Sequence, residues 1–341
     1  MTHFLSFLRM RLGTALVLVI ASNLSAQTIT TFDVPGSTDT EPAAINAGGQ
    51  VTGYYLDANL AFHGFMRDRD GTLITIDVPD STNTNATAIN ARGQITGYFL
   101  DATFATHGFL RERDGTFTTI DVPDSVEDGV YWHTSETAGI AINRAGQVTG
   151  YYRQNTVPSG ETRVQTFLRN SDGTFTTFGM GSGVDMRPTA INREGQVVGT
   201  VYFYDPAGPT EAFLREPDNT VSAFSDDSGA TVFKDINPGG RIVGWGRKLG
   251  SFLMQPDGRV TTFDVSNSIL TFPNAINASR QITGFYINAD NSLHGFLRER
   301  HGTFTTFDAP DSSYTYPTDI NPAGQITGYF QDANGVHGFL R

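Results

Sequence analysis

The sequence contains no cysteine and only two lysines, Lys234 and Lys248. Without cysteine there are no disulfide bonds, so the fold must be held together by packing and hydrogen bonds. A sustained 3.6-residue apolar period is also missing, which excludes helices as the main elements. Long apolar runs are missing except at residues 12–21, so no other segment could cross a membrane.

The first 26 residues have the features of a secretory signal peptide. Arg9 and Arg11 precede the apolar run, and small and polar residues follow it as far as Ala26. We expect cleavage after Ala26, leaving one exported domain over residues 27–341, either extracellular or periplasmic. The alternative is an uncleaved membrane anchor, although a spanning helix needs about 20 apolar residues.

Acidic residues outnumber basic ones by 35 to 23, and the formal net charge is −12. Two of the arginines and none of the acids lie in the leader, so its removal leaves 21 basic against 35 acidic residues. An acidic surface repels phosphate backbones, which excludes nucleic acid as an expected partner. Acidity also keeps an exported protein soluble, and we expect a monomer.

What the sequence does contain is a repeat. The dipeptide Ile-Asn occurs seven times, 40 to 53 residues apart, ending at Asn46, Asn90, Asn143, Asn192, Asn237, Asn277 and Asn321. Each copy is followed by a glycine, at Gly53, Gly97, Gly150, Gly199, Gly244, Gly284 and Gly328. A phenylalanine follows in turn, at Phe65, Phe109, Phe167, Phe213, Phe252, Phe296 and Phe339. We number the repeats 1 to 7 by these asparagines.

One repeat, residues 87–125, divides into four short runs, a to d: "TAIN", "QITGYFL", "HGFLRER" and "TFTTIDV". These runs are rich in Ile, Thr, Phe and Tyr and are bounded by turn residues such as Asp114-Gly115, as antiparallel strands are. Four strands in each repeat of this length are typical of a β-propeller blade. The sequence therefore predicts an all-β, seven-bladed propeller.

The two ends of the chain carry partial repeats. Residues 28–37 contain a run d with no run a, b or c before it, and residues 337–341 form a run c with no run d after it. An open array would leave exposed strand edges, which favour aggregation. We therefore predict that residues 28–34 join the last blade as its fourth strand and close the ring. The alternative, an open solenoid, would need polar caps at both ends.

The motif order Ala-Ile-Asn, Gly-Gln-Ile/Val-Thr-Gly-Tyr and His-Gly-Phe-Leu-Arg resembles the HAF repeats of secreted bacterial proteins, named for a His-Ala-Phe tripeptide. The resemblance covers essentially all of residues 27–341. This chain has His-Gly-Phe at His63, His107, His294 and His337, Glu211-Ala212-Phe213 in repeat 4, and no histidine there in repeats 3 and 5. The resemblance implies an extracellular location and a repeat architecture. It brings no reaction, so no functional residue is carried over.

The histidines that begin run c lie one loop away from an aspartate, as His63 does from Asp57. Because this pair recurs in several repeats and a catalytic site occurs once, we predict a structural hydrogen bond across each loop. The sequence has no P-loop, zinc-protease helix or nucleophile elbow. No metal site and no cofactor are predicted.

Recognition is expected where the repeat is broken. Repeat 3 has an enlarged d–a connection, residues 125–139, and an enlarged b–c connection, residues 153–165, on the same face of the ring. Aromatic rings beside carboxylates suit a glycan, a peptide or a protein partner. The candidate binding residues are Glu127, Asp128, Tyr131, Trp132, His133, Glu136, Glu161 and Arg163. The alternative is a tolerated surface insertion.

Two other functions stay open. Asp235 and Asp319 replace the alanine that precedes Ile-Asn in the other five repeats, and run a is the innermost strand. They are the candidate catalytic residues of a glycoside hydrolase or polysaccharide lyase at the mouth of the axial channel. A purely structural cell-surface module is the third alternative, and it predicts no pocket.

Overall fold

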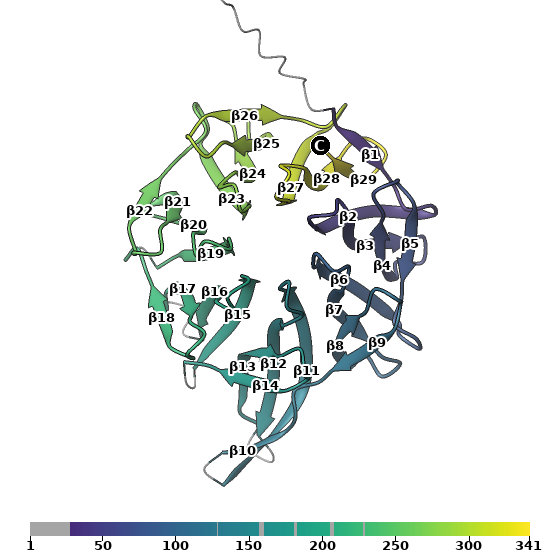
Figure 1. Ribbon diagram of the computed structural model, residues 1–341, viewed down its shortest axis with the longest axis vertical. Coiled ribbons are helices and arrows are strands. Elements are labelled where there is room, and N and C mark those ends of the chain that lie inside the picture. Colours follow the sequence, from purple (N-terminus) through teal and green to yellow (C-terminus); the bar gives the residue numbers. More distant parts are fainter. Residues whose placement is uncertain (1–27, 128, 157–159, 181–182, 205–207, 228) are drawn as a thin grey trace, which may run out of the picture.

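The computed structural model describes residues 28–127, 129–156, 160–180, 183–204, 208–227 and 229–341. The predicted signal peptide, residues 1–26, lies outside them. All regular structure in the described residues is β-strand, and none of it is a helix that could span a membrane. The all-β prediction is confirmed. Figure 1 shows the strands grouped around a central opening, with the first strand of each repeat innermost.

Repeats 1 to 6 each supply at least four consecutive strands, and repeat 7 supplies three. The strands of repeats 1 and 2 are β2 (Ser37–Ile45), β3 (Val51–Asp57), β4 (Phe62–Arg67), β5 (Leu73–Ile76), β6 (Asn83–Ile89), β7 (Ile95–Leu100), β8 (Thr106–Arg111) and β9 (Phe117–Ile120). Those of repeats 3 and 4 are β10 (Ser125–Glu127), β11 (Val130–Ile142), β12 (Val148–Thr156), β13 (Thr162–Arg169), β14 (Phe175–Phe178), β15 (Val184–Ile191), β16 (Val197–Phe203), β17 (Thr210–Arg215) and β18 (Val221–Phe224). Those of repeats 5 to 7 are β19 (Thr231–Ile236), β20 (Ile242–Gly246), β21 (Gly250–Met254), β22 (Val260–Thr262), β23 (Leu270–Ile276), β24 (Ile282–Ile287), β25 (Leu293–Arg298), β26 (Phe304–Phe307), β27 (Tyr314–Ile320), β28 (Ile326–Gln331) and β29 (Val336–Leu340).

Pairing within each set is antiparallel and follows the chain order, as in β2–β3–β4–β5. Single parallel residue pairs join some neighbouring sets, for example Leu293 with Tyr314 and Asp39 with Val336. The remaining strand, β1 (Thr30–Phe32), pairs antiparallel with β29, where Phe32 lies opposite Gly338. The first and last strands of the described chain therefore lie side by side (Figure 1).

The repeated phenylalanine is the centre of each apolar core. All seven phenylalanines have a relative exposure of 0%. The repeated glycine lies opposite it on the neighbouring strand, as Gly97 lies opposite Phe109. A Cβ on Gly97 would lie 1.9 Å from the backbone oxygen of Asn85 and 2.9 Å from the Phe109 ring. Only glycine, which has no Cβ, lets the first and second strands approach this closely beside the phenylalanine side chain.

The repeated asparagine makes two kinds of hydrogen bond. In repeat 1, Asn46 Oδ1 accepts the N–H groups of Gly48 and Gln50 in its own turn, at 2.9 and 3.0 Å. Its Nδ2 donates to the backbone oxygen of Asn90 in the next repeat, at 3.0 Å. The second bond recurs from each repeat to the next, and Asn321 donates in the same way to the oxygen of Asn46 at 3.2 Å.

The connections form two faces. The turn face carries the links from first to second and from third to fourth strands, such as residues 46–50 and 68–72. The loop face carries the links from second to third strands and from one repeat to the next, such as residues 101–105 and 121–124.

Candidate functional site

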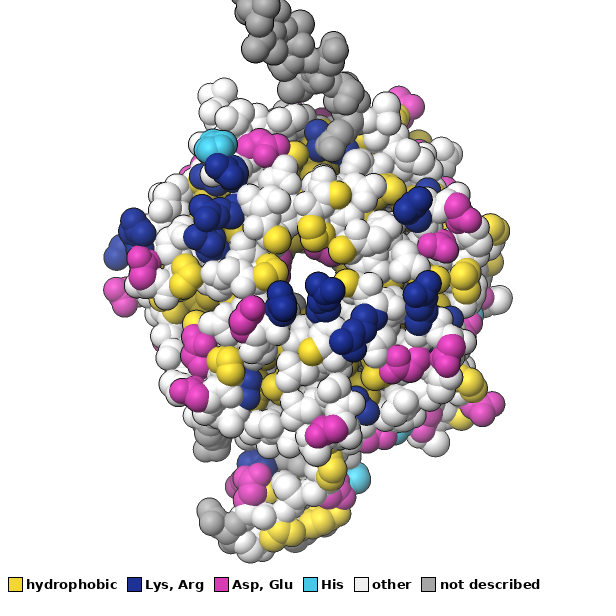
Figure 2. Space-filling model, viewed as in Figure 1, with side chains coloured by type: hydrophobic (Ala, Val, Ile, Leu, Met, Phe, Trp, Pro, Cys, Tyr) yellow, Lys and Arg dark blue, Asp and Glu magenta, His cyan; other side chains and the backbone are white. Residues whose placement is uncertain are grey.

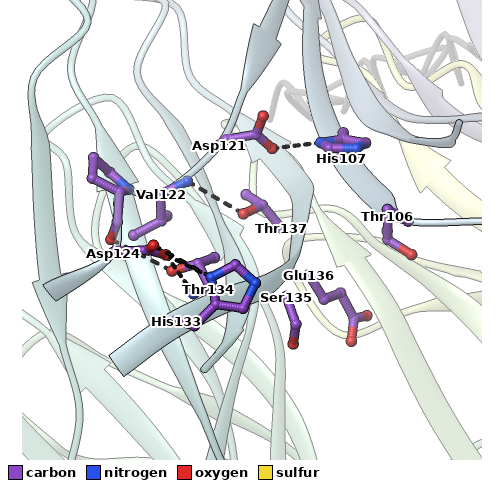
Figure 3. A pocket seen from close by; sticks show the side chains of 12 residues that line it. Thr106, His107, Asp121, Val122, Asp124, His133, Thr134, Ser135, Glu136 and Thr137 are labelled. Carbon is purple, nitrogen blue, oxygen red and sulfur yellow. Dashed lines mark hydrogen bonds and ion pairs between the residues drawn. The ribbon is translucent and has the colours of Figure 1, made fainter. Parts of the chain in front are cut away.

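A pocket of about 470 Å³ opens on the loop face between repeats 2 and 3 (Figure 3). Its walls come from the start of β8, the segment after β9 and the first half of β11. It forms because β11 has 13 residues, whereas its counterpart β6 has seven. The insertion predicted as a loop is therefore a hairpin of β10 and β11 that projects from the ring (Figure 1).

Two imidazole–carboxylate pairs face this pocket. His107 Nδ1 lies 2.9 Å from Asp121 Oδ1, and His133 Nδ1 lies 3.2 Å from Asp124 Oδ1. His107 belongs to the regular repeat, whereas His133 comes from the insertion. Among the described residues, no group of three His, Asp or Glu side chains could hold a metal ion.

Asp124 fixes the start of β11 to the preceding connection. Its carboxylate accepts the hydroxyl of Tyr131 and the backbone N–H of Thr134, the latter at 2.7 Å. These hydrogen bonds, with that of Tyr131 the larger effect, hold the pKa of Asp124 below its usual range. The pocket therefore keeps a negative charge at neutral pH.

Glu136 is a second fixed carboxylate in the lining. Tyr151 donates its hydroxyl to Oε1 at 3.0 Å, and Arg153 donates Nε to Oε2 at 2.9 Å. Burial, followed by the charge of Glu136, raises the pKa of Tyr151 to about 12, so the phenol stays a donor. The pocket thus presents carboxylates and imidazoles, which accept hydrogen bonds from hydroxyl, ammonium or guanidinium groups.

The other predicted binding residues form a cluster of their own. The guanidinium of Arg163 lies 3.9 Å from the ring centroid of Trp132 and donates to both oxygens of Glu127 at 2.6 and 2.7 Å. These contacts hold β10, β11 and β13 together, and Arg163 is only 9% exposed. Glu161 is exposed just before β13, and Asp128 lies outside the described residues.

Asp235, one of the two candidate catalytic acids, lines a cavity of about 220 Å³ on the axis. Its two oxygens accept the N–H groups of Ile236 and of Ile276 in the next repeat, at 2.7 and 2.8 Å. Burial, followed by the charge of Asp319 in the same cavity, raises the pKa of Asp235 to about 7 against the lowering effect of these bonds.

Asp319 repeats this arrangement in repeat 7. It accepts the N–H of Ile320 at 2.7 Å and that of Ile45 in repeat 1 at 2.8 Å, and burial raises its pKa. Each acid therefore ties its own innermost strand to the next one. Lys234 lines the same cavity, and burial lowers its pKa.

Outside the pocket, His63 and His337 both lie near the aspartate predicted across the loop, and each has a closer contact to a second aspartate that was not predicted. His63 Nε2 lies 3.7 Å from Asp57 across the loop, but its Nδ1 lies 2.9 Å from Asp77, which follows the fourth strand. In repeat 7 the corresponding partner comes from the other end of the chain. His337 Nδ1 lies 2.9 Å from Asp33, and its Nε2 lies 3.1 Å from Asp332.

Replacing His337 with Ala is expected to destabilise the protein in a pH-dependent way. Burial lowers the pKa of His337, but Asp33 and Asp332 outweigh it, and the net shift is upward. A raised histidine pKa stabilises the fold below the unfolded value of about 6.5, and this contribution is lost as the pH rises through the folded value. We expect a loss of about 1 kcal/mol at pH 5.5 and a smaller loss at pH 8.5, measured by urea unfolding.

A double-mutant cycle tests the origin of this effect. Asp33→Asn should cost less in the His337→Ala background than in the wild type, because the two groups share one contact. Equal costs in both backgrounds would contradict the assignment.

No protein-family model matches the sequence, and no curated protein matches it. Solved structures do match. A streptogramin B lyase is 13% identical with a TM-score of 0.57, over 92% of this chain and 97% of that one. A prolyl endopeptidase is 12% identical with a TM-score of 0.60, over 87% of this chain and 47% of that one. The acylaminoacyl peptidase of Pyrococcus horikoshii is 11% identical with a TM-score of 0.59, over 92% and 51%.

The fold is that of the β-propellers. At these identities the likeness shows the fold alone, and this chain spans about half the length of the two peptidases. The similarity assigns no family, so the HAF-repeat resemblance stays a prediction.

Proposed function

We infer that the seven repeats are seven blades of a propeller closed by its N-terminal strand. Three contacts between repeat 7 and the start of the chain support this closure. They are the β1–β29 ladder, the parallel pair of Asp39 with Val336, and the hydrogen bond from Asn321 to Asn46. A closed ring leaves no free edge at either end, which is how a cysteine-free chain can hold this shape.

We propose that this propeller is an exported binding module of the HAF-repeat kind, and that its ligand occupies the pocket between repeats 2 and 3. The observation that carries the proposal is the pocket itself, which is built where the insertion interrupts the repeat. His133 and the remaining lone pairs of the Asp124 and Glu136 oxygens give it fixed acceptors. The ligand class is an extracellular glycan, peptide or protein segment that presents hydroxyl or basic groups.

The enzymatic alternative, a glycoside hydrolase or polysaccharide lyase, has less support. Asp235 and Asp319 each use both carboxylate oxygens on backbone N–H groups. An acid and a nucleophile need an oxygen free to reach the glycosidic bond.

Replacing His107 with Ala is expected to weaken binding on a glycan or peptide array by about tenfold. The change removes an imidazole that can hydrogen-bond a ligand, and it removes the hydrogen bond that positions Asp121. His133→Ala should act in the same direction. The matched control is His63→Ala, because His63 makes the same 2.9 Å contact to an aspartate but does not line the pocket.

Equal loss of binding in His63→Ala and His107→Ala would mean that the effect comes from the repeat and not from the pocket. Unchanged binding in both His107→Ala and His133→Ala would place the ligand elsewhere.

A further inference from the structure

The turn face carries exposed arginines on several repeats, and those of the four consecutive repeats 1 to 4 play no part in the pocket described above. They are Arg69, Arg92, Arg113, Arg144 and Arg193, all of them exposed. Arg92, Arg144 and Arg193 lie in turns between first and second strands, at the inner ends of the repeats. Figure 2 shows Lys and Arg side chains beside the central opening and over repeats 1 and 2.

The guanidinium groups of these five arginines make no ion pair or hydrogen bond within the described residues. In the part of the chain that the structure describes, arginine ion pairs are made by Arg153, Arg163, Arg187 and Arg259 only. No hydrogen bond within the described residues uses the guanidinium of any of the five. Five unpaired cations are unexpected in a chain with a formal charge of −12, where carboxylates are plentiful.

Three of the arginines share a shallow pocket of about 420 Å³ between the turns of repeats 1 and 2, lined by Arg69, Arg92 and Arg113. Its two carboxylates each use one oxygen, Oδ1, for hydrogen bonds within the protein. Asp68 accepts from Gln50 Nε2 at 3.3 Å and from the backbone N–H of Arg69 at 2.8 Å, and Asp70 caps its own turn. The three guanidinium groups make no hydrogen bond or ion pair within the described residues, so all of their donors are left for a ligand.

Two of these side chains pack against turn glycines. A Cβ on Gly49 would lie 3.7 Å from Cγ of Arg69, and one on Gly93 would lie 3.6 Å from Cγ of Arg113. Each arginine stem thus lies across the inner turn of its own repeat. Both glycines have positive φ, of 81° in each case, so the turn conformation itself requires them.

We propose that the turn face binds an acidic polysaccharide, with Arg69, Arg92 and Arg113 holding its carboxylate or sulfate groups. Guanidinium forks pair with planar or tetrahedral oxyanions through two parallel hydrogen bonds. Arg144 and Arg193 continue the series on the next two repeats, which suits a chain of charged units better than a single ion. A DNA duplex or a membrane is disfavoured, because either would also cover the acidic turns of this face, such as those with Glu112 and Asp114.

The test uses the purified protein on immobilised alginate, dextran sulfate and uncharged dextran. We expect retention by alginate or dextran sulfate, weakened by added NaCl, and none by dextran. The alginate and sulfate arms distinguish carboxylate from sulfate recognition. Arg92→Ala and Arg113→Ala should each lower the affinity about fivefold, with unchanged thermal unfolding.

The matched control is Arg300→Ala. Arg300 occupies the position of Arg113 in the equivalent turn of repeat 6 and lies outside the pocket. Its removal should change the affinity less than about twofold. An equal loss in Arg300→Ala and Arg113→Ala, tighter binding to duplex DNA or anionic vesicles, or no retention on either acidic polysaccharide would overturn the proposal. His107→Ala, in the other pocket, should leave this binding unchanged.

Discussion

Deletion of residues 28–34 is expected to unfold the whole protein cooperatively and not to loosen one repeat. The segment supplies β1 to the ladder of β29, and its Phe32 and Val34 pack into the core of repeat 1 with Ile45 and Phe65. Burying a large apolar side chain stabilises by about 1.5–3 kcal/mol. The loss of two such side chains and a strand is comparable to the entire 5–15 kcal/mol stability that is typical of a domain.

Urea unfolding followed by circular dichroism and tryptophan fluorescence measures this loss. A milder version is Val34→Ala, which should cost about 2 kcal/mol because Val34 is 5% exposed. Val126→Ala is its control, since Val126 is 68% exposed and should cost almost nothing. A deleted protein that unfolds at the same urea concentration as the intact one would contradict closure by the N-terminal strand.

Much of the fold could be predicted because equivalent residues make the same contacts in every repeat. The fixed order of asparagine, glycine and phenylalanine marks each repeat, and in the structure these residues supply the turn, the close strand approach and the core. The hydrogen bond from Asn46 to the backbone of Asn90 could not be predicted in this way. Its acceptor is a main-chain oxygen in another repeat, and no residue type marks it.

The candidate site was predictable in position but not in form. The break in repeat 3 indicates where the regular structure ends, yet β10 and β11 form a hairpin there and not a loop. Trp132 looks like a binding residue in the sequence, whereas in space one of its faces is covered by Arg163. The sequence did not indicate Asp121 and Asp124 as pocket residues, because both belong to a segment that recurs in ordinary repeats.

The arginines of the turn face gave no signal either. Each of them sits in a short regular turn, where an exposed basic residue is normal. Only the arrangement in space shows that Arg69, Arg92 and Arg113 meet in one pocket.

Replacing Asp235 with Ala is expected to change stability with opposite sign at low and high pH. Burial and the charge of Asp319 raise the pKa of Asp235 to about 7 in the folded protein, well above its ordinary value of 3.8. The folded state therefore binds more protons than the unfolded state between about pH 4 and 7, and the contribution of Asp235 falls as the pH rises through this range. By pH 8 the contribution of Asp235 to the free energy of unfolding has fallen by on the order of 4 kcal/mol.

The alanine variant has no such penalty but leaves the N–H groups of Ile236 and Ile276 without this acceptor, at a cost of about 1–3 kcal/mol. Five repeats carry alanine at this position, so the backbone conformation is compatible with alanine. We expect the variant to be less stable than the wild type at pH 3.5 and more stable at pH 8, by about 1–3 kcal/mol each way in urea titrations.

Glu194→Ala is the control, since it removes an exposed carboxylate from a turn and should leave the stability nearly unchanged. Asp319 and Lys234 line the same cavity, and the charge of Asp319 acts on Asp235, so the measured pH dependence belongs to these groups together. If Asp235→Ala has the same sign at both pH values, the acid is ionised throughout and its hydrogen bonds to the next repeat outweigh its burial.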